Sequence, residues 1–291
     1  MTRSMLFVPG DSARKFESAL RTAADSLIID LEDSVAPGRK ADARQTTLNM
    51  LLMPRSHTKL LFVRVNALDT GMTLADLAAV MQGRPYGVAL PKCQSADDVK
   101  KLSLYLDAFE AAGGAPVGST RVLAIVTETA QSLFRLGAYA DAGPRLWGMM
   151  WGAEDLSASL GANANRKDGR WLDPYLVARS LCLAGAAAAG VAAIDTVETD
   201  IGDLERLRVA SIDGRRDGFS CKAVIHPKHV DVVNEAFLPT EEERAWAQRV
   251  ITAFAADPDA GVVKLDDMMI DKPHLRVARR LLGITSVHGT E

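Results

Sequence analysis

The sequence has few cysteines and no long run of apolar residues. Its three cysteines, Cys93, Cys182 and Cys221, are odd in number, far apart and not spaced as zinc ligands are. This pattern is typical of reduced thiols in a cytoplasmic protein, and we expect them to be small buried side chains. The first apolar run is too short for a secretory signal, and no other stretch approaches a membrane-spanning length. The sequence therefore predicts a cytoplasmic protein without a membrane partner.

An excess of basic charge is also absent. The chain has 34 lysine and arginine residues against 37 aspartate and glutamate residues, and its net charge is −3. The basic residues are scattered instead of gathered in a stripe, so the sequence offers no field for binding nucleic acid. With 291 residues, 48% of them hydrophobic, the chain has enough material for one large domain or two ordinary ones.

The sequence does contain eight short apolar runs, each bounded by turn residues. They lie at 5–9, 26–32, 60–66, 86–92, 121–128, 146–152, 191–197 and 221–227. Stretches of helical length separate them, with apolar residues recurring every three or four positions. Alternating strands and helices predict a parallel sheet of buried strands, and eight such units fit an α/β protein of the (β/α)8 TIM barrel type. A doubly wound sheet is the alternative, but it would need a glycine fingerprint after the first strand, where only Gly10 is present.

A polar segment follows the eighth run. It covers residues 239–291 and begins with TEEE, which resembles a helix capping box. The segment is too long to be the eighth helix alone. We therefore predict a barrel catalytic domain over residues 1–238 and a C-terminal helical extension over 239–291, which packs on the barrel mouth or on a neighbouring subunit.

The catalytic groups of such barrels lie where the strands end. Glu128 and Asp155 close the fifth and sixth predicted strands, which are neighbours in a barrel. Two carboxylates this close repel each other unless a cation lies between them, and with waters and a chelating substrate they form a site for Mg2+. The alternative is that each acid stands at the start of a helix, with Asp155 as the N-cap. Glu154 has to point elsewhere and is expected to be a brace.

Arg64 stands inside an otherwise apolar strand. Arginine is almost never buried without a partner, so Arg64 requires a negative group. That group is either Asp30 or Glu32 on the neighbouring strand, or the carboxylate of a substrate, which suits the planar guanidinium fork. Asp33 is expected to brace the same loop.

Two further residues offer rival chemistry. Lys92, at the end of the fourth predicted strand, is placed to form a Schiff base with a carbonyl substrate. A Schiff-base lysine has no use for the Glu128 and Asp155 pair, which makes this alternative the weaker one. His226 is either a general base or a packed core histidine bonded to the backbone, and we favour the second role.

Seven motifs taken together resemble a known family. In chain order they are RSMLFVPGDSARKFESA, IIDLEDSVAPGRKADAR, VRVN, ALPK, TETA, WGAEDLSASLG and KAVIHPKHV. They resemble the citrate lyase beta-subunit family, whose relatives are the malyl-CoA and citramalyl-CoA lyases and the HpcH/HpaI-type aldolases, over about residues 3–285. The resemblance implies a Mg2+-dependent barrel that cleaves or forms the carbon–carbon bond of a 3-hydroxyacyl-CoA thioester. It also implies a homo-oligomer, either a trimer or a hexamer.

The resemblance also assigns roles to residues. It implies that Glu128 and Asp155 bind the metal, that Glu128 also touches the substrate, and that Arg64 holds the oxo-acid end. An acidic residue from the tail of a neighbouring subunit, matching Asp271, would complete the catalytic groups. The positions that would contact CoA match Phe7, Arg14, Arg39 and Lys40.

Three alternatives stay open at this point. In the first, the chain is a class II aldolase acting on free oxo acids. In the second, it is a citrate lyase subunit acting on a citryl thioester of an acyl carrier protein. In the third, it is a thioester-binding subunit without catalysis. Citryl, malyl and citramalyl groups differ little in size, so the sequence does not identify the acyl group.

Overall fold

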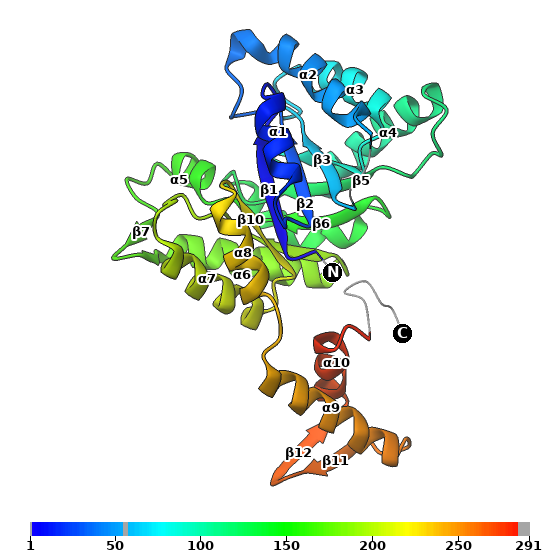
Figure 1. The fold of residues 1–291 in the computed structure, drawn as a ribbon, viewed down its shortest axis with the longest axis vertical. Coiled ribbons are helices and arrows are strands. Elements are labelled where there is room, and N and C mark those ends of the chain that lie inside the picture. The colour runs from blue at the N-terminus through cyan, green and yellow to red at the C-terminus, as the bar shows by residue number, and fades with distance from the viewer. Residues whose placement is uncertain (1, 55–57, 285–291) are drawn as a thin grey trace.

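A closed barrel of eight parallel strands forms the body of the protein. The computed structural model describes residues 2–54 and 58–284. Around the barrel the strands follow the order β1-β2-β3-β4-β5-β6-β9-β10, and β10 pairs with β1 to close it (Figure 1). Every neighbouring pair is parallel, so the predicted (β/α)8 barrel is confirmed. No helix in the described ranges is long and apolar enough to cross a membrane.

The eight predicted strands are all present, but most are shorter than predicted. They are β1 (Ser4–Pro9), β2 (Ser26–Asp30), β3 (Leu60–Arg64), β4 (Gly87–Leu90), β5 (Arg121–Ile125), β6 (Leu146–Met150), β9 (Ala192–Asp195) and β10 (Cys221–Val224). The apolar runs continue past the last ladder bonds into the loops that cover the barrel mouth. The prediction that Glu128 and Asp155 close the fifth and sixth strands is therefore wrong by a few residues. Glu128 lies in the loop after β5, and Asp155 lies in the first turn of the helix after β6.

Helices cover the outside of the barrel. They are α1 (Ala13–Leu20), α2 (Lys40–Leu52), α3 (Thr73–Val80), α4 (Ala96–Ala112), α5 (Glu154–Leu160), α6 (Asp173–Ala188), α7 (Leu204–Asp217) and α8 (Lys228–Ala236), with short 3₁₀ helices η1 (Pro37–Arg39), η2 (Met81–Gly83) and η3 (Ser132–Asp141). The helix-start alternative holds for Asp155 in part: Asp155 lies in the first turn of α5, but the N-cap is Ala153 and not Asp155. It is wrong for Glu128, because η3 begins four residues after it.

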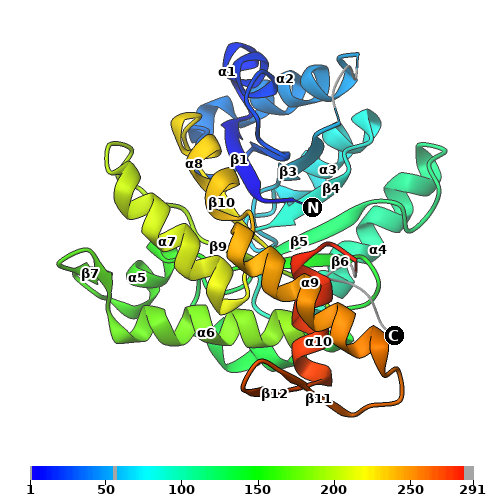
Figure 2. The same ribbon diagram turned by 60° about the horizontal axis from the view of Figure 1, so that its bottom comes forward.

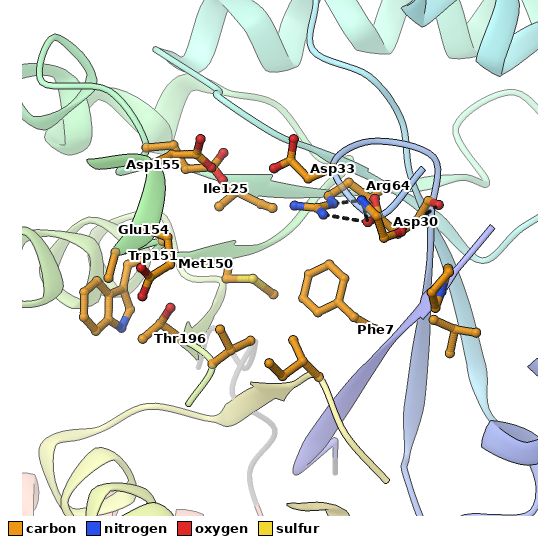
Figure 3. Close-up of a pocket in the computed structure, with 18 residues that line it drawn as sticks. Phe7, Asp30, Asp33, Arg64, Ile125, Met150, Trp151, Glu154, Asp155 and Thr196 are labelled. Atoms are coloured by element: carbon orange, nitrogen blue, oxygen red, sulfur yellow. Dashed lines mark hydrogen bonds and ion pairs between the residues drawn. The ribbon is translucent and has the colours of Figure 1, made fainter. Parts of the chain in front are cut away.

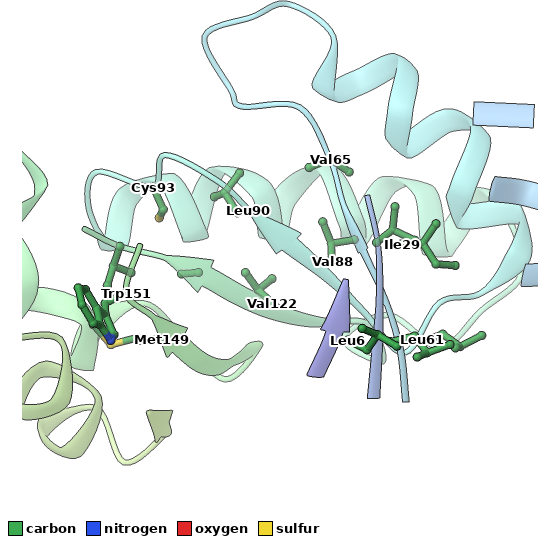
Figure 4. Packing of buried hydrophobic residues seen from close by; sticks show 14 of the residues in the cluster. Leu6, Ile29, Leu61, Val65, Val88, Leu90, Cys93, Val122, Met149 and Trp151 are labelled. Carbon is green, nitrogen blue, oxygen red and sulfur yellow. The ribbon is translucent and has the colours of Figure 1, made fainter. Parts of the chain in front are cut away.

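Successive strand residues point to opposite faces of the barrel wall. Leu6, Ile29 and Val88 pack outward against the helices (Figure 4). Their neighbours Met5 and Ile28 belong to a separate cluster that fills the barrel interior. Burial on both faces explains why the strands read as continuous apolar runs. All three cysteines are free and buried, as predicted.

A small hairpin that the sequence did not predict follows α5. It pairs β7 (Arg166–Lys167) with β8 (Arg170–Trp171) in antiparallel fashion. The guanidinium of Arg166 lies 3.5 Å from the centre of the Trp171 ring and also bonds Glu198 at 2.6 Å. A stacked and ion-paired arginine therefore fixes this hairpin beside the barrel mouth.

The C-terminal segment is not wholly helical, and this prediction was wrong. It contains α9 (Glu241–Ala256) and α10 (Lys272–Leu281), joined by an antiparallel hairpin of β11 (Val262–Leu265) and β12 (Met268–Asp271). The predicted capping box is present, because Thr240 and Glu243 bond each other's backbone N–H groups at the start of α9. The segment has a small core of its own, made by Ala247, Val250, Phe254, Ile270 and Ala278.

This segment does not cover the mouth of its own barrel. Figures 1 and 2 show α9 and α10 near the N-terminus of the chain, at the end where the strands begin. A cavity at this seam is lined by Arg3 and Ser220 from the barrel and by Leu281 from α10. Packing on its own barrel mouth is therefore excluded, and packing on a neighbouring subunit remains a prediction, as does a domain division after residue 238.

Candidate active site

A cavity of about 410 Å³ opens at the ends of the barrel strands (Figure 3). Four of the residues to which the family resemblance assigns a role line it: Phe7, Arg64, Glu128 and Asp155. They come from four different strands or the segments just after them, as is typical of active sites in this fold. The cavity is also lined by apolar side chains and by other acids, among them Ile125, Met150, Trp151, Asp30, Asp33 and Glu154.

Glu128 is a buried carboxyl group in the loop after β5. Only 5% of the residue is exposed, and its Oε2 accepts a hydrogen bond of 2.5 Å from the backbone N–H of Lys92. Burial, together with the nearby charges of Asp155 and Glu32, raises the pKa of Glu128 to about 8. Glu128 therefore resists ionisation, and a cation bound beside it would stabilise its charged form.

The loops after β5 and β6 are joined by two hydrogen bonds. The N–H of Gly152 donates to Thr127 Oγ1 at 2.8 Å, and the Thr127 hydroxyl donates to the Gly152 carbonyl at 3.0 Å. A Cβ at position 152 would lie 3.0 Å from Cγ of Glu128. A side chain at position 152 would press on Glu128, so glycine permits the close approach between Glu128 and the turn leading to Asp155.

Asp155 differs from its neighbour Glu154 in direction and in access. The Asp155 side chain is 34% exposed and borders the cavity. Glu154 also borders the cavity, but its carboxylate accepts a hydrogen bond from Asn165 Nδ2 at 3.0 Å. Glu154 thus ties α5 to the loop that follows it, which is the bracing role predicted for it.

Arg64 forms the ion pair that was one of its two predicted roles. Its Nε and Nη2 bond the two oxygens of Asp30 at 2.6 and 2.7 Å, and its Nη1 lies 3.0 Å from Glu32. Two of the five N–H groups of the guanidinium bond Asp30, and the contact with Glu32 is an ion pair without a hydrogen bond. Figure 3 shows the guanidinium directed into the cavity, and its Cζ lies 4.9 Å from the centre of the Phe7 ring. The N–H groups that do not bond Asp30 remain for a substrate, so the ion pair does not exclude the second role.

Lys92 lies among several acidic side chains and keeps its positive charge. Its ammonium bonds Glu32 at 2.5 Å and lies 3.5 Å from Asp155 and 3.8 Å from Asp33. Burial disfavours the charged ammonium, but the hydrogen bond and charge of Glu32 outweigh it, and the pKa of Lys92 rises above its ordinary value. A Schiff base needs the neutral amine, so the geometry argues against that alternative.

The residues expected to contact CoA are found in different settings. Phe7 lines the cavity, and Arg14 is exposed on α1. Arg39 is exposed and lies 3.5 Å from Asp42. The ammonium of Lys40 donates to the carbonyls of residues 31 and 32 at 2.7 and 2.6 Å. Lys40 therefore braces the loop after β2, and its charge is already engaged there.

Asp271 and His226 both lie outside the cavity. Asp271, on β12, bonds His274 and does not line the cavity of its own chain, so its role in a neighbouring subunit stays a prediction. His226 is partly exposed and accepts the N–H of Lys228 at 3.2 Å, so it is bonded to the backbone but is not a core histidine. The fully buried histidine is His229, one turn further along.

Sequence reasoning missed a buried charge network behind the cavity. Asp195 accepts a hydrogen bond from Nε1 of Trp151 at 2.6 Å and another from the ammonium of Lys222 at 3.1 Å. Trp151 lies next to Gly152 and lines the cavity, so the network holds the turn before Asp155. Lys222 is only 1% exposed. Lys222 could have been found from the sequence, because it is a charged residue inside an apolar strand, as Arg64 is.

The donor set fits one kind of metal better than others. Within residues 2–54 and 58–284, no three histidine, cysteine, aspartate or glutamate side chains form a ready-made metal cage. Mg2+ needs no such cage, because it takes one or two carboxylates and completes its shell with water and substrate oxygens. Glu128 and Asp155, from loops after paired strands, match this requirement.

The whole chain can be compared with known proteins. Residues 3–227 match the sequence model of HpcH/HpaI aldolase/citrate lyase, and residues 198–290 match that of a C–C bond lyase of the TIM-barrel fold. The chain is 36% identical over 289 residues to citrate lyase subunit beta of Escherichia coli (strain K12), covering 99% of this chain and 94% of the relative. It is 33% identical over 283 residues to a (3S)-malyl-CoA thioesterase of Cereibacter sphaeroides (strain KD131), covering 97% and 93%.

A solved structure shows the same likeness in three dimensions. It is CitE from Mycobacterium tuberculosis in complex with magnesium, acetoacetate and coenzyme A. It has a TM-score of 0.81, is 36% identical in sequence, and the match covers 97% of each chain. Fold, site and comparisons together define a carbon–carbon lyase built on a TIM barrel. The chain belongs to the HpcH/HpaI aldolase/citrate lyase family and resembles the citrate lyase beta subunit.

Proposed function

We propose that the protein is a Mg2+-dependent lyase that cleaves or forms the carbon–carbon bond of a 3-hydroxyacyl-CoA thioester. The candidate substrates are citramalyl-, malyl- and citryl-CoA, and the products are an oxo acid and an acyl-CoA. The main support for the proposal is that Glu128, Asp155 and Arg64 line the same cavity. A similar chain, CitE, has been solved with magnesium, acetoacetate and coenzyme A.

The acids would hold the metal and the arginine would hold the substrate. Bound at Glu128 and Asp155, Mg2+ would lower the pKa of the substrate hydroxyl and stabilise the negative charge that develops on it. Arg64 points into the cavity, and its N–H groups that do not bond Asp30 would bind the substrate carboxylate in a fixed orientation. Asp30 keeps Arg64 in place, because the paired arginine lowers the pKa of Asp30 and both groups stay charged.

The thioester would extend from the cavity towards the first two loops. Phe7 forms part of the cavity wall, and the cations Arg14 and Arg39 are exposed beyond it. We assign these two arginines to the CoA phosphates. Lys40 is assigned an indirect part, because its ammonium shapes the same loop from within.

The last catalytic group would come from another copy of the chain. Asp271 lies on the far side of its own barrel from the cavity, so it can act only in a neighbouring subunit. There its carboxylate would take the proton that the substrate hydroxyl loses and return it to the enolate of the acyl thioester after bond cleavage. This assignment makes a homo-oligomer, a trimer or a hexamer, the proposed active form.

Incubation of the purified protein with Mg2+ and each of the three thioesters tests the proposal. We expect one of them to yield an oxo acid and an acyl-CoA, with activity lost on treatment with EDTA and in Glu128→Gln and Asp155→Asn variants. Full activity in the metal-free protein would contradict the proposal. Turnover of free hydroxy acids at the same rate would favour an aldolase, and turnover only of a citryl thioester on an acyl carrier protein would favour a citrate lyase subunit.

A further inference from the structure

Lys92 contacts both proposed metal ligands through two different groups. Its backbone N–H donates to Glu128 Oε2 at 2.5 Å, and its ammonium lies 3.5 Å from Oδ1 of Asp155. The backbone of Lys92 has φ of +50°, in the left-handed region that residues with a side chain seldom adopt. This conformation lets the N–H point to one ligand while the side chain reaches the other.

The ammonium is anchored by a third acid. It is 2.5 Å from Glu32, which is hydrogen-bond distance, but 3.5 Å from Asp155, which is not. Lys92 therefore fixes its own position on Glu32 and supplies charge, without orienting the Asp155 carboxylate. In the part of the chain that the structure describes, Lys92 is the one cation in ion-pair contact with Asp155 and with Asp33.

We propose that Lys92 is a built-in counter-ion that holds the cation position beside Asp155 and thereby weakens Mg2+ binding until the substrate is present. The inference rests on the proposed function. A Mg2+ ion on Asp155 would share that carboxylate with a fixed positive charge a few ångströms away, and like charges at this distance repel each other. A substrate carboxylate brings negative charge and offsets the repulsion, so metal and substrate reinforce each other's binding. Lys92 thus acts on the metal through its charge and is not a catalytic residue.

Substitution of the side chain separates its two contacts. Lys92→Met removes the charge but keeps the backbone N–H to Glu128, whereas Lys92→Arg keeps the charge. We expect calorimetric titration with Mg2+ alone to give a Kd about tenfold lower, or lower still, for Lys92→Met than for the unchanged protein. Lys92→Arg should stay close to the unchanged protein. Saturating pyruvate should tighten Mg2+ binding to the unchanged protein more than to Lys92→Met.

A control variant and a second readout complete the test. Lys59→Met removes a lysine of similar exposure that bonds backbone carbonyls of Thr22 and Ala24, away from the cavity, and should leave the Mg2+ Kd unchanged. Without metal, Lys92→Met should melt at a lower temperature than Lys92→Arg, because its acid cluster has lost a counter-ion.

Two results would overturn the inference. One is a Mg2+ Kd for Lys92→Met that equals or exceeds that of the unchanged protein, and the other is the same Kd shift in Lys92→Arg as in Lys92→Met. If the unchanged protein binds no Mg2+ at millimolar concentrations, the proposed function fails instead. The counter-ion role is then decided by melting of the metal-free variants: equal melting temperatures would reject it, and a fall confined to Lys92→Met would support it.

Discussion

Thr127 and Gly152 each donate one hydrogen bond to the other, just after the ends of β5 and β6. The contact joins the loop that carries Glu128 to the turn that leads to Asp155. Neither residue has a charge, and neither is proposed to touch the metal. Their pairing nevertheless sets how far apart the two carboxylates lie, because each acid is within three residues of the contact.

Thr127→Val should therefore weaken metal binding without touching a metal ligand. Valine has nearly the same shape but lacks the hydroxyl, and loss of outer-shell partners typically costs 10–100-fold in metal affinity. We expect a rise of about this size in the Mg2+ Kd, measured by titration calorimetry. Thr127→Ser retains the hydroxyl and serves as the matched control. Equal Mg2+ affinity in the valine and serine variants would show that the hydrogen bonds do not position the ligands.

The raised pKa of Glu128 predicts a pH dependence of stability. The folded protein keeps a proton on Glu128 up to a pKa of about 8, whereas the unfolded chain releases it near the ordinary value of about 4.3. The folded state thus binds more protons in this window, so the metal-free protein loses stability as the pH rises from about 5 to 8. Melting temperatures across this range should fall, and the fall should be smaller in Glu128→Gln. A melting profile unaffected by this substitution would contradict the assignment.

The same group should make metal binding depend on pH. Mg2+ and the proton compete for the Glu128 carboxylate, so the apparent Mg2+ affinity should increase up to a pH of about 8 and then level off. Titrations at pH 6, 7 and 8 give the slope. A constant Kd over this range would mean that Glu128 is already ionised, or that it does not bind the metal.

The buried pair of Asp195 and Lys222 predicts a loss of stability. Removal of one partner typically costs about 3–5 kcal/mol when the other charge stays buried and uncompensated. Without Lys222, Asp195 would keep Arg179 at 3.5 Å as a cation and Trp151 as a donor. We therefore expect Lys222→Met to lower the free energy of unfolding in urea titrations by no more than about 3–5 kcal/mol. Arg208→Ala removes an exposed, solvent-screened pairing with Glu205 and should have a much smaller effect. Similar effects of the two substitutions would show that burial does not set the strength of these pairs.

The placement of Asp271 predicts that two inactive variants restore each other. Glu128→Gln lacks a metal ligand but has an intact Asp271, and Asp271→Asn has the reverse defect. Subunits mixed after reversible dissociation would form some sites with both groups intact, and activity should reappear. Asp271→Asn alone should lower kcat by about 10²–10⁴-fold, the range for loss of a general acid, with the Mg2+ Kd unchanged. Mixtures as inactive as their components would place Asp271 outside the active site.

The arrangement of the barrel was predictable because it depends on a repeated pattern. Eight apolar runs separated by helical segments indicated the fold, and motifs at the strand ends indicated where Glu128, Asp155 and Arg64 would meet. The hairpin of β11 and β12 was not predictable in the same way. Its exposed Met268 and Met269 show no alternation of apolar and polar residues, and its turn depends on Asp266 in a left-handed conformation.

The sequence pattern also did not show which groups the charged residues would contact. Lys92 was visible as a lysine at a strand end, but its bond to Glu32 depends on how the loop after β2 folds back. Lys40 was expected at CoA, yet its ammonium is held by backbone carbonyls of that same loop. Both outcomes depend on loop conformation, which neither periodicity nor residue type determines.

Identification of the products formed from each hydroxyacyl-CoA tests the central claim most directly, because it shows which bond breaks. Carbon–carbon cleavage releases an oxo acid and an acyl-CoA in equal amounts, with no free thiol. Hydrolysis of the thioester, as the name of the Cereibacter sphaeroides relative indicates for that protein, would release free CoA instead. We predict oxo acid and acyl-CoA in a one-to-one ratio, in the presence of Mg2+ and not after its removal. Free CoA without any oxo acid, or cleavage that persists without the metal, would contradict the account.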